Sequence, residues 1–249
     1  GDGRPDLASA VAHGRAQIAA GADILDIGGE STRPGNTPID AREELRRVIP
    51  VVREMRAVAP HATISIDTFK PGVFAAAHDA GADLLNSVWG FDDALLALAV
   101  ERDVPIVIMH NKRVAMYERD VVDEVLAYLE AQATRAIAAG IPPEATIVDP
   151  GIGFGKTPED NLALLAALDR IVALGYPTLL GTSRKSTIGK LIGRDANERA
   201  FGTAATVALA VAAKIDIVRV HDVAEMRDVV TVADAIVRGN RPCGLADTP

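Results

Sequence analysis

Hydrophobic and polar positions along the chain follow two alternating spacings, and the shorter one predicts strands. Each predicted strand is short, rich in β-branched residues and apolar at consecutive positions, which is typical of parallel strands covered by helices. The predicted strands are Ala22–Gly28, Thr63–Asp67, Leu84–Val88, Pro105–His110, Thr146–Asp149, Thr178–Ser183 and Ile217–His221.

The segments between these runs carry apolar residues at helical spacing. They predict helices over residues 7–20, 40–58, 71–80, 92–102, 119–139, 158–174, 196–213 and 223–238. Strands that alternate with helices in this way indicate an α/β fold built from repeated strand–helix units.

A weak internal repeat narrows the fold class to a barrel. The octapeptide at 19–26 recurs at 79–86 and is echoed at 212–219. Gly21 and Gly81 stand where a helix should end in a left-handed residue, directly before a strand. Such tight turns favour a (β/α)8 TIM barrel. Because eight helices accompany only seven strands and the chain opens with a helix, we expect the first strand to be missing from this chain. An open sheet is the alternative.

Composition excludes several classes of protein. Hydrophobic residues make up 49% of the 249 residues and charged residues 24%, which is typical of a globular domain. We expect a single domain over residues 1–249, with a frayed tail at 240–249. No apolar run reaches the roughly 20 residues of a membrane span. The net charge of −8 argues against a broad nucleic-acid surface. The single cysteine, Cys243, excludes an internal disulfide framework and favours a reducing compartment, the cytoplasm.

Polar and charged residues gather where the predicted strands end, although the strand bodies are apolar. Active sites of such barrels lie at the carboxyl ends of the strands. Charged residues at buried strand ends are uncommon unless they serve a pair or a ligand. The end positions are Asp26, Asp67, Asn86, Met109, His110, Asp149, Ser183, Lys185, Arg219 and His221.

These residues divide into two chemical groups. Carboxylates and an amide suit a planar heterocycle rich in N–H donors; they are Asp26, Asp67, Asn86 and Asp149. Cationic side chains suit a phosphate; they are Arg33, Lys185, Arg219 and His221. The segment 183–186 also precedes a predicted helix, whose N-terminal amides favour an anion. The residues therefore predict a ligand with an N–H-rich ring and a phosphate.

Asp26 and the glycine-rich loops also have a purely structural interpretation. Asp26 would serve equally as a buried acid paired with a neighbouring cation. The glycines at 28–29 and 151–155 would serve as turn residues only. The glycine run at 151–155 has neither the spacing of a dinucleotide fingerprint nor that of a Walker A loop. The five histidines and one cysteine show no zinc-ligand spacing.

Five motifs together resemble dihydropteroate synthase. They are Asp-Ile-Gly-Gly-Glu-Ser-Thr-Arg-Pro-Gly (26–35), Ser-Ile-Asp-Thr (65–68), Asp-Pro-Gly-Ile-Gly-Phe-Gly-Lys (149–156), Ser-Arg-Lys-Ser (183–186) and Arg-Val-His-Asp (219–222). They occur in the family's order, and the resemblance covers residues 7–238. It implies a (β/α)8 barrel of folate biosynthesis that joins 6-hydroxymethyl-7,8-dihydropterin diphosphate to p-aminobenzoate, releasing diphosphate and 7,8-dihydropteroate. Sulfonamides compete with p-aminobenzoate in this family.

The resemblance also assigns roles to residues. It implies that the pterin is held by Asp67, Asn86, Asp149 and Lys185. It places the diphosphate on Thr32, Arg219, the backbone of Val220, and His221. It places p-aminobenzoate beside Arg33, Pro34, Lys185 and Ser186. Asp26 and Met109 complete the expected substrate-binding set, and catalysis is expected from Asp67, Lys185, Arg219 and His221.

Mg²⁺ is the implied cofactor, and this chain shows two departures from the family. The family's first strand supplies an asparagine for the metal, so we see no metal ligand here, and residues 1–6 resemble only the end of a flexible active-site loop. Ser87 stands where the family usually has aspartate.

The resemblance leaves two alternatives open and implies a quaternary structure. A related barrel that transfers a methyl group from methyltetrahydrofolate to a corrinoid protein would share the pterin acids, but it would not need the cationic group. A non-catalytic pterin-binding paralogue would fit Ser87 and the missing strand. We also expect a homodimer, from the resemblance and from the late segments Ala204–Ala213 and Val229–Val237, which are rich in Ala and Val.

Overall fold

A computed structural model of the chain describes residues 6–31 and 37–239. Within these residues the seven predicted strands are present and all parallel. They are β1 (Ile24–Gly28), β2 (Thr63–Asp67), β3 (Leu84–Ser87), β4 (Ile106–Met109), β5 (Thr146–Asp149), β6 (Leu179–Leu180) and β7 (Ile217–Val218).

Ten α-helices surround the strands in the described part of the chain. They are α1 (Leu7–Ala19), α2 (Ala41–Val58), α3 (Pro71–Asp79), α4 (Asp93–Glu101), α5 (Val121–Ala139), α6 (Pro158–Ala166), α7 (Leu168–Val172), α8 (Ser186–Ile192), α9 (Ala200–Ala212) and α10 (Val223–Val237). Two short 3-10 turns, Pro143–Ala145 and Ala196–Glu198, complete the set. Within the described residues, no helix is long and apolar enough to cross a membrane.

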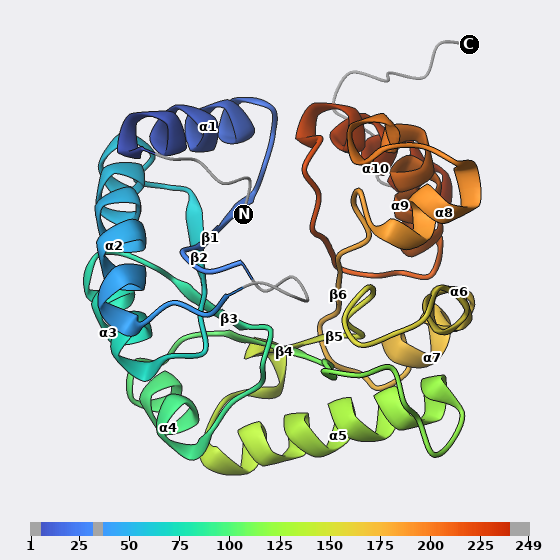
Figure 1. The fold of residues 1–249 in the computed structure, drawn as a ribbon, viewed down its shortest axis with the longest axis horizontal. Helices are drawn as coiled ribbons and strands as arrows, with labels where there is room; N and C mark the ends of the chain where they lie inside the picture. Colours follow the sequence, from blue (N-terminus) through green and yellow to red (C-terminus); the bar gives the residue numbers. More distant parts are fainter. Residues whose placement is uncertain (1–5, 32–36, 240–249) are drawn as a thin grey trace.

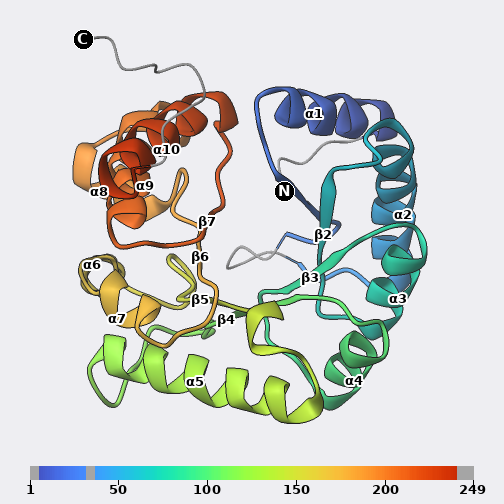
Figure 2. The ribbon, with the colours of Figure 1, turned by 180° about the vertical axis from the view of Figure 1, so that it is seen from behind.

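The strands follow one another around a ring in chain order, as an α/β barrel requires. β1 to β5 form one sheet, β6 pairs with β7, and a bridge between Val148 and Thr178 joins the two groups. Figure 1 shows the helices on the outside of this ring, with α1 and α10 flanking the place where β7 and β1 are not paired. Figure 2 shows the same arrangement from behind. No eighth strand lies between β7 and β1 in the described residues.

Side chains nevertheless connect β7 with β1 across this edge. The Arg219 guanidinium pairs with the Asp26 carboxylate at 2.8 Å, and Gln17 donates to the carbonyl of His221 at 3.3 Å. Arg227 on α10 pairs with Asp23 at 2.9 Å. The two edge strands therefore lie within direct side-chain reach of each other.

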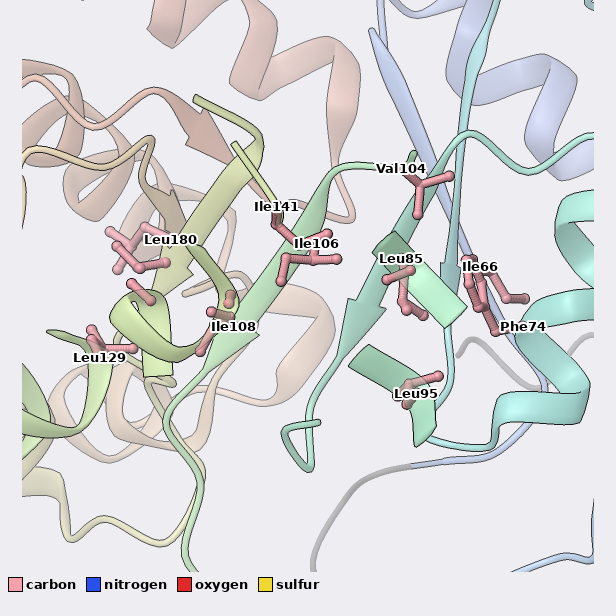
Figure 3. Packing of buried hydrophobic residues seen from close by; sticks show 14 of the residues in the cluster. Ile66, Phe74, Leu85, Leu95, Val104, Ile106, Ile108, Leu129, Ile141 and Leu180 are labelled. Atoms are coloured by element: carbon pink, nitrogen blue, oxygen red, sulfur yellow. The ribbon is translucent and has the colours of Figure 1, made fainter. Parts of the chain in front are cut away.

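Alternation along the strands separates an outer core from an inner one. Residues that point outward pack against the helices, where Phe74, Leu95 and Leu129 contact the sheet (Figure 3). Residues that point inward, into the barrel, form a smaller apolar layer. It consists of Leu84, Val107, Ile147 and Leu179, with Ile217 beside it. This layer closes the interior of the barrel, so the next inward positions toward the carboxyl ends form its polar surface.

Several predicted boundaries need correction. The strands expected at 178–183 and 217–221 pair over only two residues each. The helix expected at 158–174 is two helices, because Ala167 leaves the helical conformation (φ −116°, ψ 27°). The helix expected to follow the segment 183–186 was the one at 196–213, but an additional helix, α8, begins directly at Ser186. The predicted left-handed residues Gly21 and Gly81 are confirmed, with φ of 97° and 114°.

Candidate active site

One inward layer at the carboxyl ends of the strands collects most of the predicted site residues. A strand returns to the same face every second residue. On four strands the site residue therefore lies two positions after a residue of the apolar inner layer, and on β1 and β2 it occupies the equivalent inward position. The layer consists of Asp26, Asp67, Asn86, Met109, Asp149 and Arg219. The predicted strand spacing therefore brings these six side chains to one end of the barrel.

Asp26 is the centre of the hydrogen-bond network in this layer. Its Oδ1 accepts from the Ser65 hydroxyl at 2.7 Å, and its Oδ2 accepts from the Asn86 amide at 3.2 Å. Oδ2 also accepts from Arg219 Nε at 2.8 Å. The geometry thus supports the structural interpretation of Asp26: both of its oxygens orient neighbouring site residues. Asp26 also raises the pKa of Arg219, which keeps that guanidinium charged.

Asp67 and Asp149 are the buried acids of the site. Burial raises the pKa of Asp67, and the neighbouring Asp26 raises it further. Within the described residues Asp67 Oδ1 is buried and has no hydrogen-bond partner. Burial raises the pKa of Asp149 to about 6, although its Oδ1 accepts from the Gly151 amide at 2.7 Å. Both acids therefore have a strong preference for a ligand that donates hydrogen bonds.

The glycine loop after β5 places Phe154 beside Lys185. Gly151, Gly153 and Gly155 all have left-handed backbone, with φ of 69°, 81° and 58°. A Cβ at Gly153 would approach the Lys185 stem at 3.0 Å, so glycine leaves room for that side chain. The Lys185 ammonium lies 4.0 Å from the centre of the Phe154 ring, within cation–π range.

Lys156, at the end of the same loop, has a structural role that changes the interpretation of His110. Its Nζ donates to the carbonyls of His110, Gly151 and Phe154 at 3.0–3.2 Å and lies 2.9 Å from His110 Nδ1. His110 is 2% exposed, and its ring meets Tyr128 edge-on at 5.0 Å. Burial, with Lys156 beside it, lowers the pKa of His110 to about 3. His110 is therefore a buried, neutral residue that packs against Tyr128 and Lys156.

The cationic group lies on the loops after β6 and β7. The Ser183 hydroxyl lies 3.1 Å from the His221 amide and 3.0 Å from His221 Nδ1. Arg184 forms an ion pair with Asp222, so the two loops are joined twice. Arg219 is 44% exposed, Val220 is half-buried, and Ser186 begins α8 at an exposed position. The loops bring Lys185, Arg219 and His221 to the same end of the barrel.

The loop after β1 contains the remaining predicted site residues. Thr32, Arg33 and Pro34 lie outside the described residues. The described start of this loop is held by Arg47 on α2 and by Lys70, directly before α3. Glu30 accepts from Lys70 at 2.5 Å, and the Gly29 carbonyl accepts from Arg47 at 3.0 Å.

Ser87, the departure from the family pattern, does not face the site. It follows the inward-pointing Asn86, so it points toward the helices, where its hydroxyl donates to the Gly90 carbonyl at 2.5 Å. There it supports the turn after β3. We therefore expect the change from aspartate to act on this turn and not on substrate contacts.

Some contributors to the site were not predicted from the sequence. Ser65 follows from strand alternation, since it lies two residues before Asp67. Lys70, Glu44 and Lys156 carry no comparable signal, because their partners are distant in sequence. The described residues contain no group of three or more His, Cys, Asp or Glu side chains arranged to hold a metal ion.

The fold and site together define a class: a barrel enzyme that binds an N–H-rich heterocycle beside an anion. The family model described as "Pterin binding enzyme" matches residues 2–221. Dihydropteroate synthase of Streptococcus pyogenes is 44% identical over 88% of this chain and 84% of its own length. The Bacillus subtilis enzyme is 42% identical over 93% of this chain and 81% of its own length.

Solved structures agree with these relatives. Xanthomonas albilineans dihydropteroate synthase with 4-aminobenzoic acid superposes with a TM-score of 0.90 at 44% identity, covering 95% of this chain and 88% of that one. The Thermus thermophilus enzyme in complex with 6HMPPP gives 0.85 at 46% identity, covering 93% and 90%. The chain therefore belongs to the pterin binding enzymes, among the dihydropteroate synthases.

Proposed function

We propose that this chain condenses 6-hydroxymethyl-7,8-dihydropterin diphosphate with p-aminobenzoate to give 7,8-dihydropteroate and diphosphate. The observation that carries the proposal is the layer in which buried acids and an amide face cationic side chains at one end of the barrel. A neutral pterin ring presents several N–H donors, and Asn86 and Asp149 offer acceptors for them. With its pKa near 6, Asp149 is mostly ionised at pH 7 and accepts hydrogen bonds.

The proposed reaction needs charge stabilisation more than an activated nucleophile. The C–O bond between the pterin methylene and the diphosphate breaks, and the C–N bond to the aryl amine forms. The proton leaves the new ammonium for water or the departing diphosphate. Arg219 and His221 neutralise the charge that develops on the leaving group. Asp67 stabilises positive charge on the pterin, and Lys185 lies between the pterin and p-aminobenzoate subsites.

Mg²⁺ remains the proposed cofactor, and the described residues do not form a site for it by themselves. They contain no three-ligand group, and Asp67 Oδ1 is a single unpaired oxygen. Mg²⁺ commonly binds through one or two carboxylates together with substrate phosphates and water. We therefore expect it to bind with the diphosphate and to neutralise part of its charge.

A homodimer and a cytoplasmic location complete the proposal. Large apolar side chains are exposed on α9 and α10, with Phe201 at 92%, Leu209 at 61%, Val232 at 61% and Ile236 at 78%. Such a surface supports association through these late helices. Sedimentation at micromolar concentration should give twice the chain mass, and a monomer would contradict the dimer. The cytoplasmic proposal rests on the single cysteine.

The test of the function is product formation from dihydropterin diphosphate and p-aminobenzoate, with Mg²⁺ or with a chelator. We expect dihydropteroate only with both substrates and the metal. Pterin binding without any product would favour the non-catalytic paralogue. Methyl transfer from methyltetrahydrofolate to a corrinoid protein, without dihydropteroate, would favour the methyltransferase alternative.

A further inference from the structure

The turn that presents Lys185 has an unfavourable backbone and is held from outside the site. Arg184, directly before Lys185, has a φ of 58°, a left-handed conformation that costs energy for a residue with a side chain. Such a conformation persists only where the surroundings hold it in place. The Arg184 side chain pairs with Asp222, whereas the contacts on the Arg184 backbone come from the segment just before α9 and from α9 itself.

Arg199 is the main contact. Its Nη1 donates to the carbonyls of Arg184 and Lys185, at 2.9 and 3.3 Å, and its Nε donates to the carbonyl of Arg194 at 2.9 Å. Thr203, one turn further along α9, accepts from the Arg184 amide at 3.3 Å. One guanidinium nitrogen, Nη1, therefore bonds both carbonyls at the strained turn. The Nε bond to the carbonyl of Arg194 fixes the plane in which this nitrogen lies.

Two glycines make this contact possible. A Cβ added at Gly189 on α8 would overlap the guanidinium of Arg199. A Cβ added at Gly202 on α9 would overlap the side chain of Ile188 on α8. Glycine lowers helix stability relative to alanine. Gly189 and Gly202 are explained by the close approach of α8 and α9, which lets Arg199 reach the turn.

We propose that Arg199, seated on Gly189, is a positioning residue for Lys185. It fixes the turn at Arg184 so that the Lys185 ammonium stays over the Phe154 ring, between the two proposed subsites. The expected effect on catalysis rests on the proposed function. The expected effect on the backbone at residues 184–185 does not.

The test is a double-variant cycle with Arg199→Met and Gly189→Ala. Each single variant should lower kcat/KM for the dihydropterin diphosphate at least tenfold and raise KM for both substrates. The double variant should be no worse than the poorer single one, because both changes remove the same contact. Helix propensity alone predicts instead that Gly189→Ala stabilises α8 and causes no loss of kcat/KM, since alanine stabilises helices.

Two controls separate positioning from charge and from general stability. Arg194→Met removes a positive charge from the same loop, and Gly72→Ala changes a helical glycine with no atom within 4 Å of its added Cβ; both should stay within twofold of the parent chain. Arg199→Lys keeps donors for the two carbonyls at the turn but loses the Nε bond to Arg194, so it should recover part of the activity lost in Arg199→Met. An Arg199→Lys variant no better than Arg199→Met would overturn the proposal, as would additive losses in the double variant.

Amide hydrogen exchange gives a readout that does not need activity. In Arg199→Met the amides of residues 183–186 should exchange at least tenfold faster, while those of β1–β4 stay unchanged. Unchanged exchange at the turn would refute the positioning role even if turnover fell. If the parent chain formed no dihydropteroate, the proposed function would fail, and the exchange result would still decide the inference.

Discussion

Replacing Lys70 by methionine removes the cation from a buried three-residue network. The Lys70 ammonium donates to Glu30 and Glu44, each at 2.5 Å. The side chains are 18%, 11% and 2% exposed for Lys70, Glu30 and Glu44. Glu30 begins the described part of the loop after β1, and Glu44 lies on α2. The substitution leaves two carboxylates facing each other, one of them with almost no access to water.

The expected cost follows from this burial. Removing one partner of a buried ion pair costs roughly 3–5 kcal/mol. Because Lys70 retains some exposure, we take the lower end, about 3 kcal/mol. In a chain of this size that lowers the melting temperature by roughly 6–12 °C. Burial alone would lower the pKa of Lys70, but its bonds to both glutamates raise it overall. The contribution is therefore fully present at pH 7 and is lost only as the pH rises through the raised folded-state pKa.

Calorimetry at pH 7 measures this cost against a matched exposed pair. Arg170 pairs with Asp123 at 2.7 Å with both side chains 51% exposed, so Arg170→Met should cost less than about 1 kcal/mol. The double variant Lys70→Met with Glu44→Gln should cost clearly less than the sum of its single variants, because the buried negative charge is gone. A Lys70→Met cost equal to that of Arg170→Met, or strict additivity, would refute the reasoning.

Three further outcomes are expected. Lys185→Ala should abolish pterin binding in calorimetry and product formation together, because one ammonium serves both subsites, and near-normal turnover would defeat that assignment. Burial raises the folded-state pKa of Asp149 to about 6, so its contribution to the free energy of unfolding is full below pH 4 and is lost as the pH rises through 6, by at most about 3 kcal/mol. Asp149→Asn should flatten this part of the stability profile, measured by denaturant unfolding at several pH values. An unchanged profile would contradict the burial argument. Gly151→Ala should leave little folded protein by circular dichroism, since its φ is 69° and its Cβ would overlap the His110 carbonyl; a well-folded variant would show that this loop adapts.

The polar layer at the strand ends could be predicted because strand periodicity is local. Asp26, Asp67, Asn86 and Asp149 each end an apolar run, and parallel strands bring such ends together. The arrangement among them is not local. That Asp26 would bond Ser65, Asn86 and Arg219 depends on the stagger of the strands and on the closeness of β7 to β1.

Differences between the predicted and observed structure have similar, non-local causes. His110 ends a strand, like His221, but the sequence does not show that Lys156, 46 residues away, lies against it. Helix α8 was not predicted because seven residues that include a glycine show no clear helical periodicity. Strands β6 and β7 are shorter than predicted: only two residues of each are paired, and the residues that follow belong to the loops of the site.

The most direct test of the two-part site is calorimetry with a dihydropterin that lacks the diphosphate and with one that carries it. Asn86→Ala should weaken both ligands by at least tenfold. His221→Ala should weaken the diphosphate ligand by a similar factor and leave the other within twofold. Equal losses for both ligands in His221→Ala, or no loss in Asn86→Ala, would contradict the assignment of the acidic layer to the ring and of the cationic loops to the diphosphate.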